Sequence, residues 1–328
     1  MKAIRLKKFG GPEEMFIGPS EIPKISDFEI LVQIKCSALN RADTLQRRGK
    51  YPPPPGASDI LGLEMAGEVV EIGKAVTKWK IGDSAMGLLA GGGYAQYVNI
   101  HEDLAMPFSA DLTYQEAAAI PEVFLTAYQA LVDLSKLKRG EQVLIHAGAS
   151  GVGTAAIQLS KLLGASKIFV TASKGKHQLC SELGADHCID YRAQDFSIVV
   201  NELTNGGGVD VVMDFLMAAY FQQNLNTIAM DGRLVMLASM GGIKASEINL
   251  LNILRRRIRI IGTTLRSRSL EYKINLTKGF LDLAFDKFES GELKPVVDKI
   301  FNWEDVGKAH QYMEDNLNQG KVILKIGE

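Results

Sequence analysis

The chain has 328 residues, of which 46% are apolar and 23% charged, and its formal net charge is -1. This length predicts about two domains with sizeable cores, and the charge excludes a general attraction to nucleic acid or acidic membranes. The three cysteines, Cys36, Cys180 and Cys188, are too sparse for a disulfide framework or a structural zinc cluster. No apolar signal region opens the chain and no uninterrupted apolar run reaches transmembrane length, so we expect a cytoplasmic protein without a membrane partner.

The first third of the chain has the pattern of a β-rich domain. Short runs of β-forming residues are separated by Gly, Pro and Asp, and they lie at 29–36, 66–72, 82–89 and 94–100. We place this domain at residues 1–122.

From about residue 123, helical patterns alternate with strands. Six strands are predicted, at 143–146, 167–171, 187–190, 209–214, 233–238 and 259–263. Strands and helices in this rhythm indicate an α/β fold with a doubly wound parallel sheet over 123–264. A helix at 270–290 and a strand at 321–326 follow. This last piece is too small for a core of its own, so we expect 265–328 to pack on the first domain.

The stretch QVLIHAGASGVGTAAIQLSKLLGA, residues 142–165, reads as a strand, a tight turn and the start of a helix. Its small residues follow the dinucleotide spacing G-x-G-x-x-G, with Gly148 first, Ser150 in place of the middle glycine and Gly153 last. Free N–H groups at a helix start suit a pyrophosphate. The alternative is that Gly148, Gly151 and Gly153 only let the helix pack closely on the strand.

The residues after the second and third strands of this domain bear on which dinucleotide binds. An acidic residue about twenty positions beyond the turn would bind the ribose 2′-hydroxyl of NAD. The sequence there is FVTASKGKHQ, so Ser173, Lys174 and Lys176 offer hydrogen bonds and positive charge to a 2′-phosphate, and Tyr191 could close the pocket. We therefore predict NADPH. The alternative for the lysines is an ordinary solvated helix start.

Several stretches in the same order carry a family resemblance: SALNRADTLQRRGKYPPPPG, LGLEMAGEVVEIG, GGGYAQY, AAAIPEVFLTAYQAL and the glycine-rich turn. Together they resemble the medium-chain dehydrogenase/reductases. More narrowly, they resemble the zeta-crystallin-like quinone oxidoreductases, in the branch of the tumour-suppressor-inducible quinone oxidoreductase. The resemblance spans the chain. It implies a Rossmann cofactor domain at 123–264, a GroES-like catalytic domain formed by 1–122 and 265–328, and a homodimer.

Zinc-dependent members of that superfamily use a Cys and a His of the first domain as catalytic ligands. Here Asn40 and Asp43 of LNRAD, and Leu63 of GLEMAG, stand in the corresponding stretches, so we expect no metal. Without a metal to stabilise an alkoxide, acceptors that take a hydride easily are favoured. Quinones and conjugated carbonyls are such acceptors, since charge spreads onto an oxygen.

The resemblance places the segment with Asn40 and Tyr51 against the nicotinamide and the substrate. We predict that Asn40 hydrogen-bonds the substrate oxygen and that Tyr51 donates a hydrogen bond or closes the pocket; the alternatives are a turn residue and a packed loop aromatic. The resemblance also implies cofactor contacts at Thr126, Val152, Met240, Gly241, Leu265, Gly320 and Lys321. For Met240 and Leu265, core packing is the alternative.

One departure from the family bears on the cofactor. Relatives usually have Gly-Gly after the fourth strand of this domain, whereas Met217 and Ala218 stand there in this chain. We expect their bulk to alter NADPH affinity.

The sequence as a whole predicts an NADPH-dependent quinone oxidoreductase that works without zinc. One alternative is a reductase of α,β-unsaturated carbonyls, which would use the same site. Another is a cofactor-gated RNA- or protein-binding sensor, whose only support is the arginine run Arg255, Arg256, Arg257 and Arg259. A solvated helix end is the simpler interpretation of that run, so we expect no nucleic-acid partner.

Overall fold

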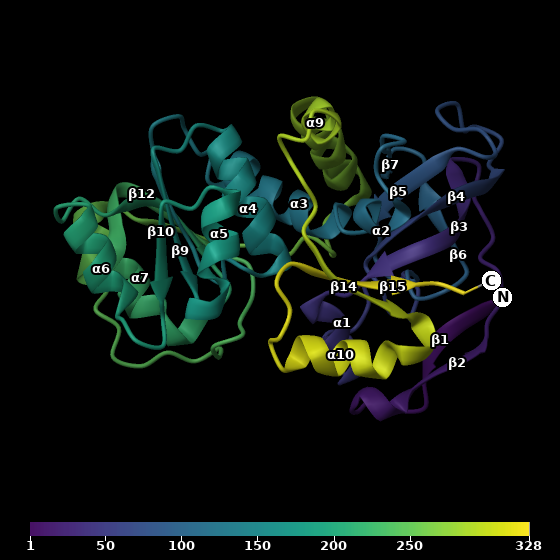
Figure 1. Ribbon diagram of the computed structural model, residues 1–328, viewed down its shortest axis with the longest axis horizontal. Helices are drawn as coiled ribbons and strands as arrows, with labels where there is room; N and C mark the ends of the chain where they lie inside the picture. The colour runs from purple at the N-terminus through teal and green to yellow at the C-terminus, as the bar shows by residue number, and fades with distance from the viewer. Residues whose placement is uncertain (328) are drawn as a thin grey trace. The chain divides into compact units, whose positions relative to one another are not determined.

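The computed structural model describes residues 1–327 and divides into two compact units (Figure 1). The first unit is Met1–Leu125 together with the chain from Leu265 onward, and the second unit is Thr126–Thr264. The predicted α/β class with a parallel sheet and a separate β-rich domain is confirmed.

The second unit is built on a six-stranded sheet in which every neighbouring pair is parallel. The spatial order is β10-β9-β8-β11-β12-β13, which is the doubly wound order with the chain starting at the centre of the sheet. Five of the six strands lie within a residue of their predicted positions, but β12 begins earlier than expected. The bounds are β8 Gln142–Ile145, β9 Lys167–Ala172, β10 His187–Asp190, β11 Val209–Asp214, β12 Ile228–Met236 and β13 Arg259–Gly262.

Helices cover both faces of this sheet. Figure 1 shows α4 and α5 on one side of the sheet and α6 and α7 on the other. A buried apolar cluster that includes Leu144, Phe169 and Leu234 joins sheet and helices. The helices and turns are π-helix η2 Gln129–Leu134, α4 Gly151–Leu162, η3 Lys174–Lys176, α5 His177–Leu183, α6 Phe196–Leu203, η4 Met217–Ala219, α7 Phe221–Thr227 and α8 Leu251–Arg256.

The first unit contains a mainly antiparallel sheet with the path β14-β15-β3-β4-β5-β7, to which β6 adds by pairing with β3. A separate hairpin consists of β1 and β2. The late strand β15 pairs antiparallel with β3, so the end of the chain is built into the sheet of the first unit. The bounds are β1 Lys2–Leu6, β2 Met15–Pro19, β3 Glu29–Ala38, β4 Glu64–Ile72, β5 Ser84–Leu88, β6 Tyr97–His101, β7 Ala105–Pro107, β14 Val297–Asn302 and β15 Lys321–Lys325.

The helices that connect the strands of the first unit are mostly short. They are η1 Pro12–Glu14, α1 Arg41–Arg47, α2 Tyr114–Ala117, α3 Pro121–Tyr128, the 20-residue α9 Leu270–Glu289, η5 Trp303–Asp305 and α10 Val306–Glu314. The stretch Tyr114–Leu134 is long and apolar enough to cross a membrane by length and composition alone. However, 67% of its apolar window is buried inside the fold, as in the core helix of a folded domain.

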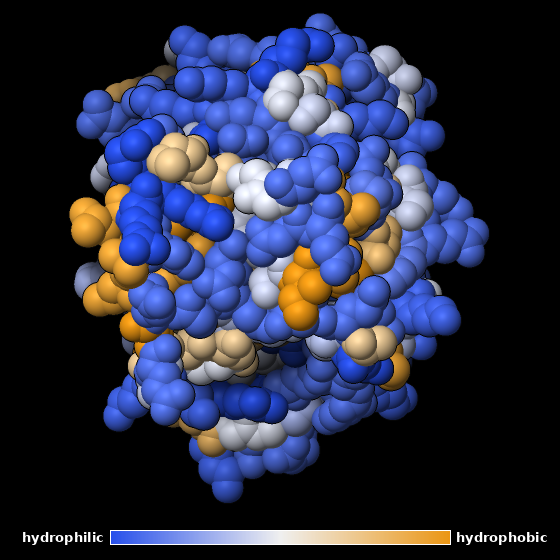
Figure 2. Space-filling model, turned by 90° about the vertical axis from the view of Figure 1, so that its left-hand side faces the viewer, coloured by the Kyte–Doolittle hydropathy of each residue, from blue (hydrophilic) through white to orange (hydrophobic). Residues whose placement is uncertain are grey.

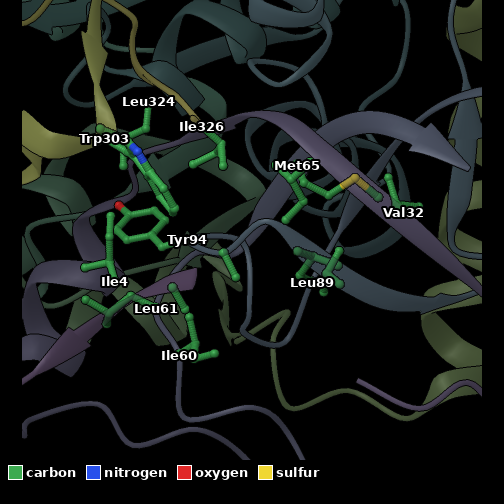
Figure 3. Close-up of a cluster of buried hydrophobic side chains, with 14 of the residues drawn as sticks. Ile4, Val32, Ile60, Leu61, Met65, Leu89, Tyr94, Trp303, Leu324 and Ile326 are labelled. Carbon is green, nitrogen blue, oxygen red and sulfur yellow. The ribbon is translucent and has the colours of Figure 1, made fainter. Parts of the chain in front are cut away.

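The core of the first unit mixes early and late parts of the chain. Figure 3 shows Tyr94 among Ile4, Leu61, Trp303 and Leu324. Together, these five side chains come from five different parts of the sequence. Because these side chains are almost completely buried, their removal from water is the main force that holds the two chain segments in one unit.

Candidate active site

The glycine-rich turn joins β8 to α4 in the second unit. Ser150 is the N-cap of α4, and its hydroxyl oxygen accepts a hydrogen bond of 3.1 Å from the N–H of Gly153. The N–H groups of Gly151 and Val152 begin the helix and have no hydrogen-bond acceptor among residues 1–327. These two amides, with the hydroxyl hydrogen of Ser150, form the free donor set of the turn, which suits a pyrophosphate.

Both outer glycines of the turn are required by close contacts. A Cβ on Gly153 would lie 2.3 Å from the carbonyl oxygen of Ala147, and one on Gly148 would lie 2.7 Å from the Cβ of Val170. Helix α4 therefore rests directly on the backbone of the turn. Close packing and anion binding are two consequences of one geometry here, since the approach that needs glycine also presents the free amides.

Residues that are predicted to bind the 2′-phosphate directly follow two adjacent strands, β9 and β10, and lie at the same edge of the sheet. Ala172 of β9 and Asp190 of β10 are register partners, and Ser173 and Tyr191 are the next residues along each strand. Tyr191 is 43% exposed and carries the guanidinium of Arg192 at 5.8 Å from its ring centroid. Arg192 was missed as a candidate from the sequence, although it follows Tyr191 directly and its positive charge is what a 2′-phosphate needs.

The segment after β12 is held against the segment after β11. The N–H of Met240 donates to the carbonyl of Phe215 at 2.9 Å, and that of Gly241 donates to Leu216 at 3.0 Å. A Cβ on Gly241 would lie 2.5 Å from the Leu216 carbonyl oxygen, whereas the Met240 side chain is 51% exposed. The core-packing alternative for Met240 is therefore wrong, and its cofactor role stays a prediction.

Met217 occupies one of the positions where the family resemblance implies glycine, and its backbone conformation is one that glycine adopts readily. Its φ is 50°, in the left-handed region that favours glycine. The Asp214 carboxylate holds this conformation by accepting from the N–H groups of Leu216, at 2.7 Å, and Met217, at 3.0 Å. The Met217 side chain is therefore carried by a backbone conformation that disfavours residues other than glycine.

Replacing Met217 with glycine is expected to stabilise the protein by about 1 kcal/mol, because the left-handed conformation costs a non-glycine residue roughly that amount. Urea unfolding followed by circular dichroism measures the change. Ala218→Gly is the matched control, since Ala218 does not have a positive φ and should lose stability or show no change. A destabilised Met217→Gly protein would show that the methionine side chain contributes more than its backbone costs.

A buried ionic network surrounds Asn40 in the first unit. Lys321 donates from Nζ to Asn40 Oδ1 and to the carbonyl oxygen of Leu39, each at 2.7 Å, and lies 2.7 Å from Glu64 Oε1. Asn40 in turn donates from Nδ2 to Glu64 Oε1 at 2.8 Å. Glu64 is fully buried and Lys321 is 3% exposed. The other carboxylate oxygen of Glu64, Oε2, accepts a hydrogen bond of 2.9 Å from the N–H of Glu122.

This network changes the predicted roles of two residues. The ammonium group of Lys321 donates to Asn40 and Leu39 and pairs with Glu64, so its side chain belongs to this network, and the predicted closure of Gly320 and Lys321 over the cofactor stays a prediction. Asn40 Nδ2 also points one hydrogen at Glu64 and the other at the carbonyl of Ala38, 3.4 Å away. This geometry favours a positioning role for Asn40 over direct donation to a substrate.

A second chain of hydrogen bonds connects α1 to His310 of α10 and to Tyr94. Arg47 donates to Nδ1 of His310 at 3.1 Å, so Nε2 carries the proton and donates to the Tyr94 hydroxyl at 3.2 Å. Tyr94 then donates to Asp43 Oδ2 at 3.2 Å. Burial, and then Arg47, lower the pKa of His310 to about 3, so its imidazole is neutral. This chain fixes the helix that precedes Tyr51.

Tyr51 lies beside a cation that sequence reasoning missed. The guanidinium carbon of Arg266 is 5.2 Å from the centroid of the Tyr51 ring. Arg266 is 7% exposed; its Nε donates to the Ala90 carbonyl at 2.8 Å and its Nη2 to Gln46 Oε1 at 2.7 Å. Its Nη1 is buried without a hydrogen-bond partner among the described residues. The only sequence signal was its position directly after Leu265.

Glu122 adds an acidic group to the electrostatics of this region. Burial, and then the charge of Glu64, raise the pKa of Glu122 to about 8. Burial also raises the pKa of the Tyr51 hydroxyl, which therefore stays a hydrogen-bond donor at neutral pH. Tyr51 and Arg266 are thus two neighbouring donors, of which Arg266 is buried and Tyr51 half-buried.

Three predicted cofactor contacts remain: Thr126, Leu265 and Gly320. Thr126 has a polar atom that is available to a ligand, and the other two residues have packing roles. Thr126 Oγ1 is buried and has no hydrogen-bond partner within residues 1–327, as expected of a group that waits for a ligand. Leu265 is 6% exposed, which agrees with its core-packing alternative. Gly320 has a φ of 88°, and a Cβ there would lie 2.4 Å from the carbonyl oxygen of Val296, so the backbone itself requires glycine.

The comparisons with known proteins agree with this architecture. Residues 26–110 match the alcohol dehydrogenase GroES-like domain, and residues 151–279 match the family described as zinc-binding dehydrogenase. A crystal structure of an NAD-dependent alcohol dehydrogenase is 30% identical, covers 100% of both chains and has a TM-score of 0.88. The chain belongs to the medium-chain dehydrogenase/reductase family. Medium-chain dehydrogenases use nicotinamide cofactors, and the free amides of Gly151 and Val152 fit that group.

Comparisons with other members of the family indicate the branch to which this chain belongs. The human quinone oxidoreductase is 27% identical over 99% of this chain and 97% of its own length. The human synaptic vesicle membrane protein VAT-1 homolog is 28% identical over 100% of this chain and 87% of its own. The crystal structure of CurK enoyl reductase superposes with a TM-score of 0.89 at 27% identity and covers 99% of both chains. This chain is an oxidoreductase of the quinone oxidoreductase-like branch.

The zinc ion in the name of the matched family does not fit the residues present. Burial raises the pKa of the Cys36 thiol to about 12, which opposes the thiolate that a metal needs. Leu63 is a buried apolar residue. Within residues 1–327 no group of three His, Cys, Asp or Glu side chains could hold a metal ion.

Proposed function

We propose that the protein is an NADPH-dependent reductase of quinone-like acceptors. The proposal rests above all on Arg266, whose buried Nη1 has no hydrogen-bond partner in the described chain and lies beside Tyr51. The nicotinamide supplies a hydride when bound, and the acceptor oxygen then gains negative charge. Arg266 and Tyr51 would donate to that oxygen, and in a site with little water such donors stabilise the charge strongly.

The preference for NADPH is supported by the ends of β9 and β10. Ser173, Lys176 and Arg192 supply hydroxyl and cationic groups there, and Ser173 and Tyr191 leave neighbouring strands at the same level. A 2′-phosphate carries negative charge that these groups can pair, whereas the ribose hydroxyl of NADH gains little from them.

The direct test is NADPH oxidation by metal-stripped protein with an ortho-quinone under anaerobic conditions, with NADH in parallel. We expect turnover with NADPH and a catalytic efficiency at least about ten-fold lower with NADH, since one charge-assisted contact is worth roughly 1.5–3 kcal/mol. Equal efficiency with both cofactors would overturn the NADPH preference. Tight NADPH binding without turnover on any quinone would overturn the reductase.

The Tyr51→Phe variant is expected to lower turnover about five-fold and to leave NADPH affinity unchanged. It removes one hydrogen bond worth roughly 1 kcal/mol and keeps the ring beside Arg266. Steady-state kinetics and a binding titration measure the two effects. Tyr114→Phe is the control, because it removes a hydroxyl that contacts Ser84 Oγ at 3.1 Å in the same unit. Unchanged turnover would leave Tyr51 with a packing role only.

Reduction of α,β-unsaturated carbonyls is the second candidate. The likeness to CurK enoyl reductase favours it, and the two donors serve an enone oxygen as well as a quinone oxygen. Competition between a quinone and an enone in one assay distinguishes the two, since the preferred acceptor suppresses reduction of the other.

The sensor hypothesis loses support from the arginine run. Arg256 donates to the carbonyl oxygens of Asn226 and Ile228, at 3.1 and 2.7 Å, and Arg257 pairs with Asp231 through bonds of 2.7 and 2.6 Å. Half of the run therefore serves local structure. We do not propose RNA binding.

A homodimer is also part of the proposal. Strand β13 is an edge of the parallel sheet, and Leu250, Leu254 and Ile243 nearby in sequence are 63%, 76% and 76% exposed. Figure 2 shows that apolar side chains gather in separate patches on a mainly hydrophilic surface. Sedimentation equilibrium tests the dimer, and a monomer at micromolar concentration would contradict it.

A further inference from the structure

Two of the three cysteines meet in the second unit, outside the groups used above. Cys180 lies on α5 and is fully buried, while Cys188 lies on β10, an edge strand, and is half-buried. Cys180 is the group that influences the pKa of Cys188 most, so the two side chains are close neighbours. Cys188 Sγ also lies 3.5 Å from the hydroxyl of exposed Ser181 and 3.6 Å from the carbonyl oxygen of His177. The partly accessible Cys188 sulfur therefore lies against the turn of α5 that carries the buried Cys180.

We propose that Cys188 and Cys180 are an oxidation site that forms a reversible disulfide on reaction with a hydroperoxide. Cys188 is the attacking thiolate, because it is the accessible member of the pair. Cys180 is the resolving thiol, because its only route to oxidation is through its neighbour. The bond requires a sulfur separation of about 2.05 Å. Because Cys188 Sγ already lies against His177 and Ser181, on the turn of α5 that carries Cys180, a local shift of that turn brings the two sulfurs together.

The chemistry balances with the hydroperoxide as the only oxidant. The Cys188 sulfur attacks the terminal peroxide oxygen, the O–O bond breaks, and the alkoxide leaves with a proton as an alcohol, or as water from hydrogen peroxide. The Cys180 thiol then loses its proton and attacks the Cys188 sulfur. The S–O bond breaks, water leaves and the S–S bond forms. Two thiols lose two electrons, and the peroxide gains them.

The surroundings of the sulfurs support the assignment of roles. The hydrogen bond from Cys180, followed by that from Ser181 and the charge of His177, lowers the pKa of Cys188 to about 6 despite its partial burial. The same contact with Cys188, together with burial, raises the pKa of Cys180. Burial raises the pKa of Cys36, on β3 of the first unit, to about 12, so Cys36 is the internal reference for an inert thiol.

The experiment treats the full-length protein with hydrogen peroxide, blocks remaining thiols and maps the peptides by mass spectrometry. We expect a Cys180–Cys188 disulfide that dithiothreitol reverses, and alkylation of Cys188 in the reduced protein at least about ten-fold faster than of Cys36. In Cys180→Ala, oxidation should stop at a Cys188 sulfenic acid that dimedone traps. The wild-type map is decisive even if that variant folds poorly. An oxidised Cys188 without a disulfide, or equal alkylation of Cys188 and Cys36, would overturn the proposal.

Discussion

Lys321→Met is expected to lower the free energy of unfolding of the first unit by about 3–5 kcal/mol, because it leaves the carboxylate of Glu64 buried without its cation. The ammonium group lies 2.7 Å from Glu64 Oε1, and both side chains are nearly inaccessible to water. Urea unfolding followed by tryptophan fluorescence measures the loss. Both tryptophans of the chain, Trp79 and Trp303, lie in the first unit, so the signal reports on that unit.

Two further variants separate charge burial from general damage to the strand. Lys325→Met changes an exposed lysine of the same strand and should cost less than about 0.5 kcal/mol. Adding Glu64→Gln to Lys321→Met removes the unpaired charge and should recover part of the loss. If Lys321→Met is no more harmful than Lys325→Met, the buried pair does not stabilise the unit.

Gly153→Ala is expected to weaken NADPH binding at least about ten-fold. The new methyl group would lie 2.3 Å from the Ala147 carbonyl oxygen and 2.5 Å from that of Gly148, so the turn must move and take the free amides with it. A shift of this kind costs affinity because the phosphate contacts depend on the approach of the backbone. Isothermal titration calorimetry measures the dissociation constant.

Gly262→Ala is the matched control for that variant. Gly262 is the last residue of β13, and a Cβ there would meet only Met236 Cε, at 4.0 Å. It should bind NADPH almost as the wild type does. Circular dichroism checks that both proteins are folded. An equal loss of affinity in the two variants would mean that the close contact at Gly153 has no special role.

The central strands of the parallel sheet could be predicted because each is a short, mainly apolar run that is buried on both faces. The strands β8, β9 and β11 show this pattern. The hairpin of β1 and β2, and the strand β14, were not predicted. Their residues are largely half-buried or exposed, so they lack a strong apolar signal, and their partners determine that they are strands.

The same contrast holds for the candidate site. The glycine-rich turn could be predicted because its donors and its steric needs lie within a few consecutive residues. The network of Asn40, Glu64 and Lys321 could not, since Lys321 meets Asn40 across a separation of 281 residues. No local pattern distinguishes a buried, saturated lysine from an exposed one. For the same reason, the sequence could not predict that Nη1 of Arg266 is available to a ligand.

The interruption of the first unit by the second has a consequence for synthesis on the ribosome. Strand β15 lies between β14 and β3, so the sheet of the first unit stays unfinished until the last part of the chain is translated. Glu64 meanwhile has no ammonium partner, which favours a solvated, open arrangement of its strand. The second unit is continuous in sequence and can complete its own core earlier, as nascent domains generally fold one at a time. The nascent chain should therefore complete its second unit before its first, with the emergence of Lys321 as the step that supplies the cation for Glu64.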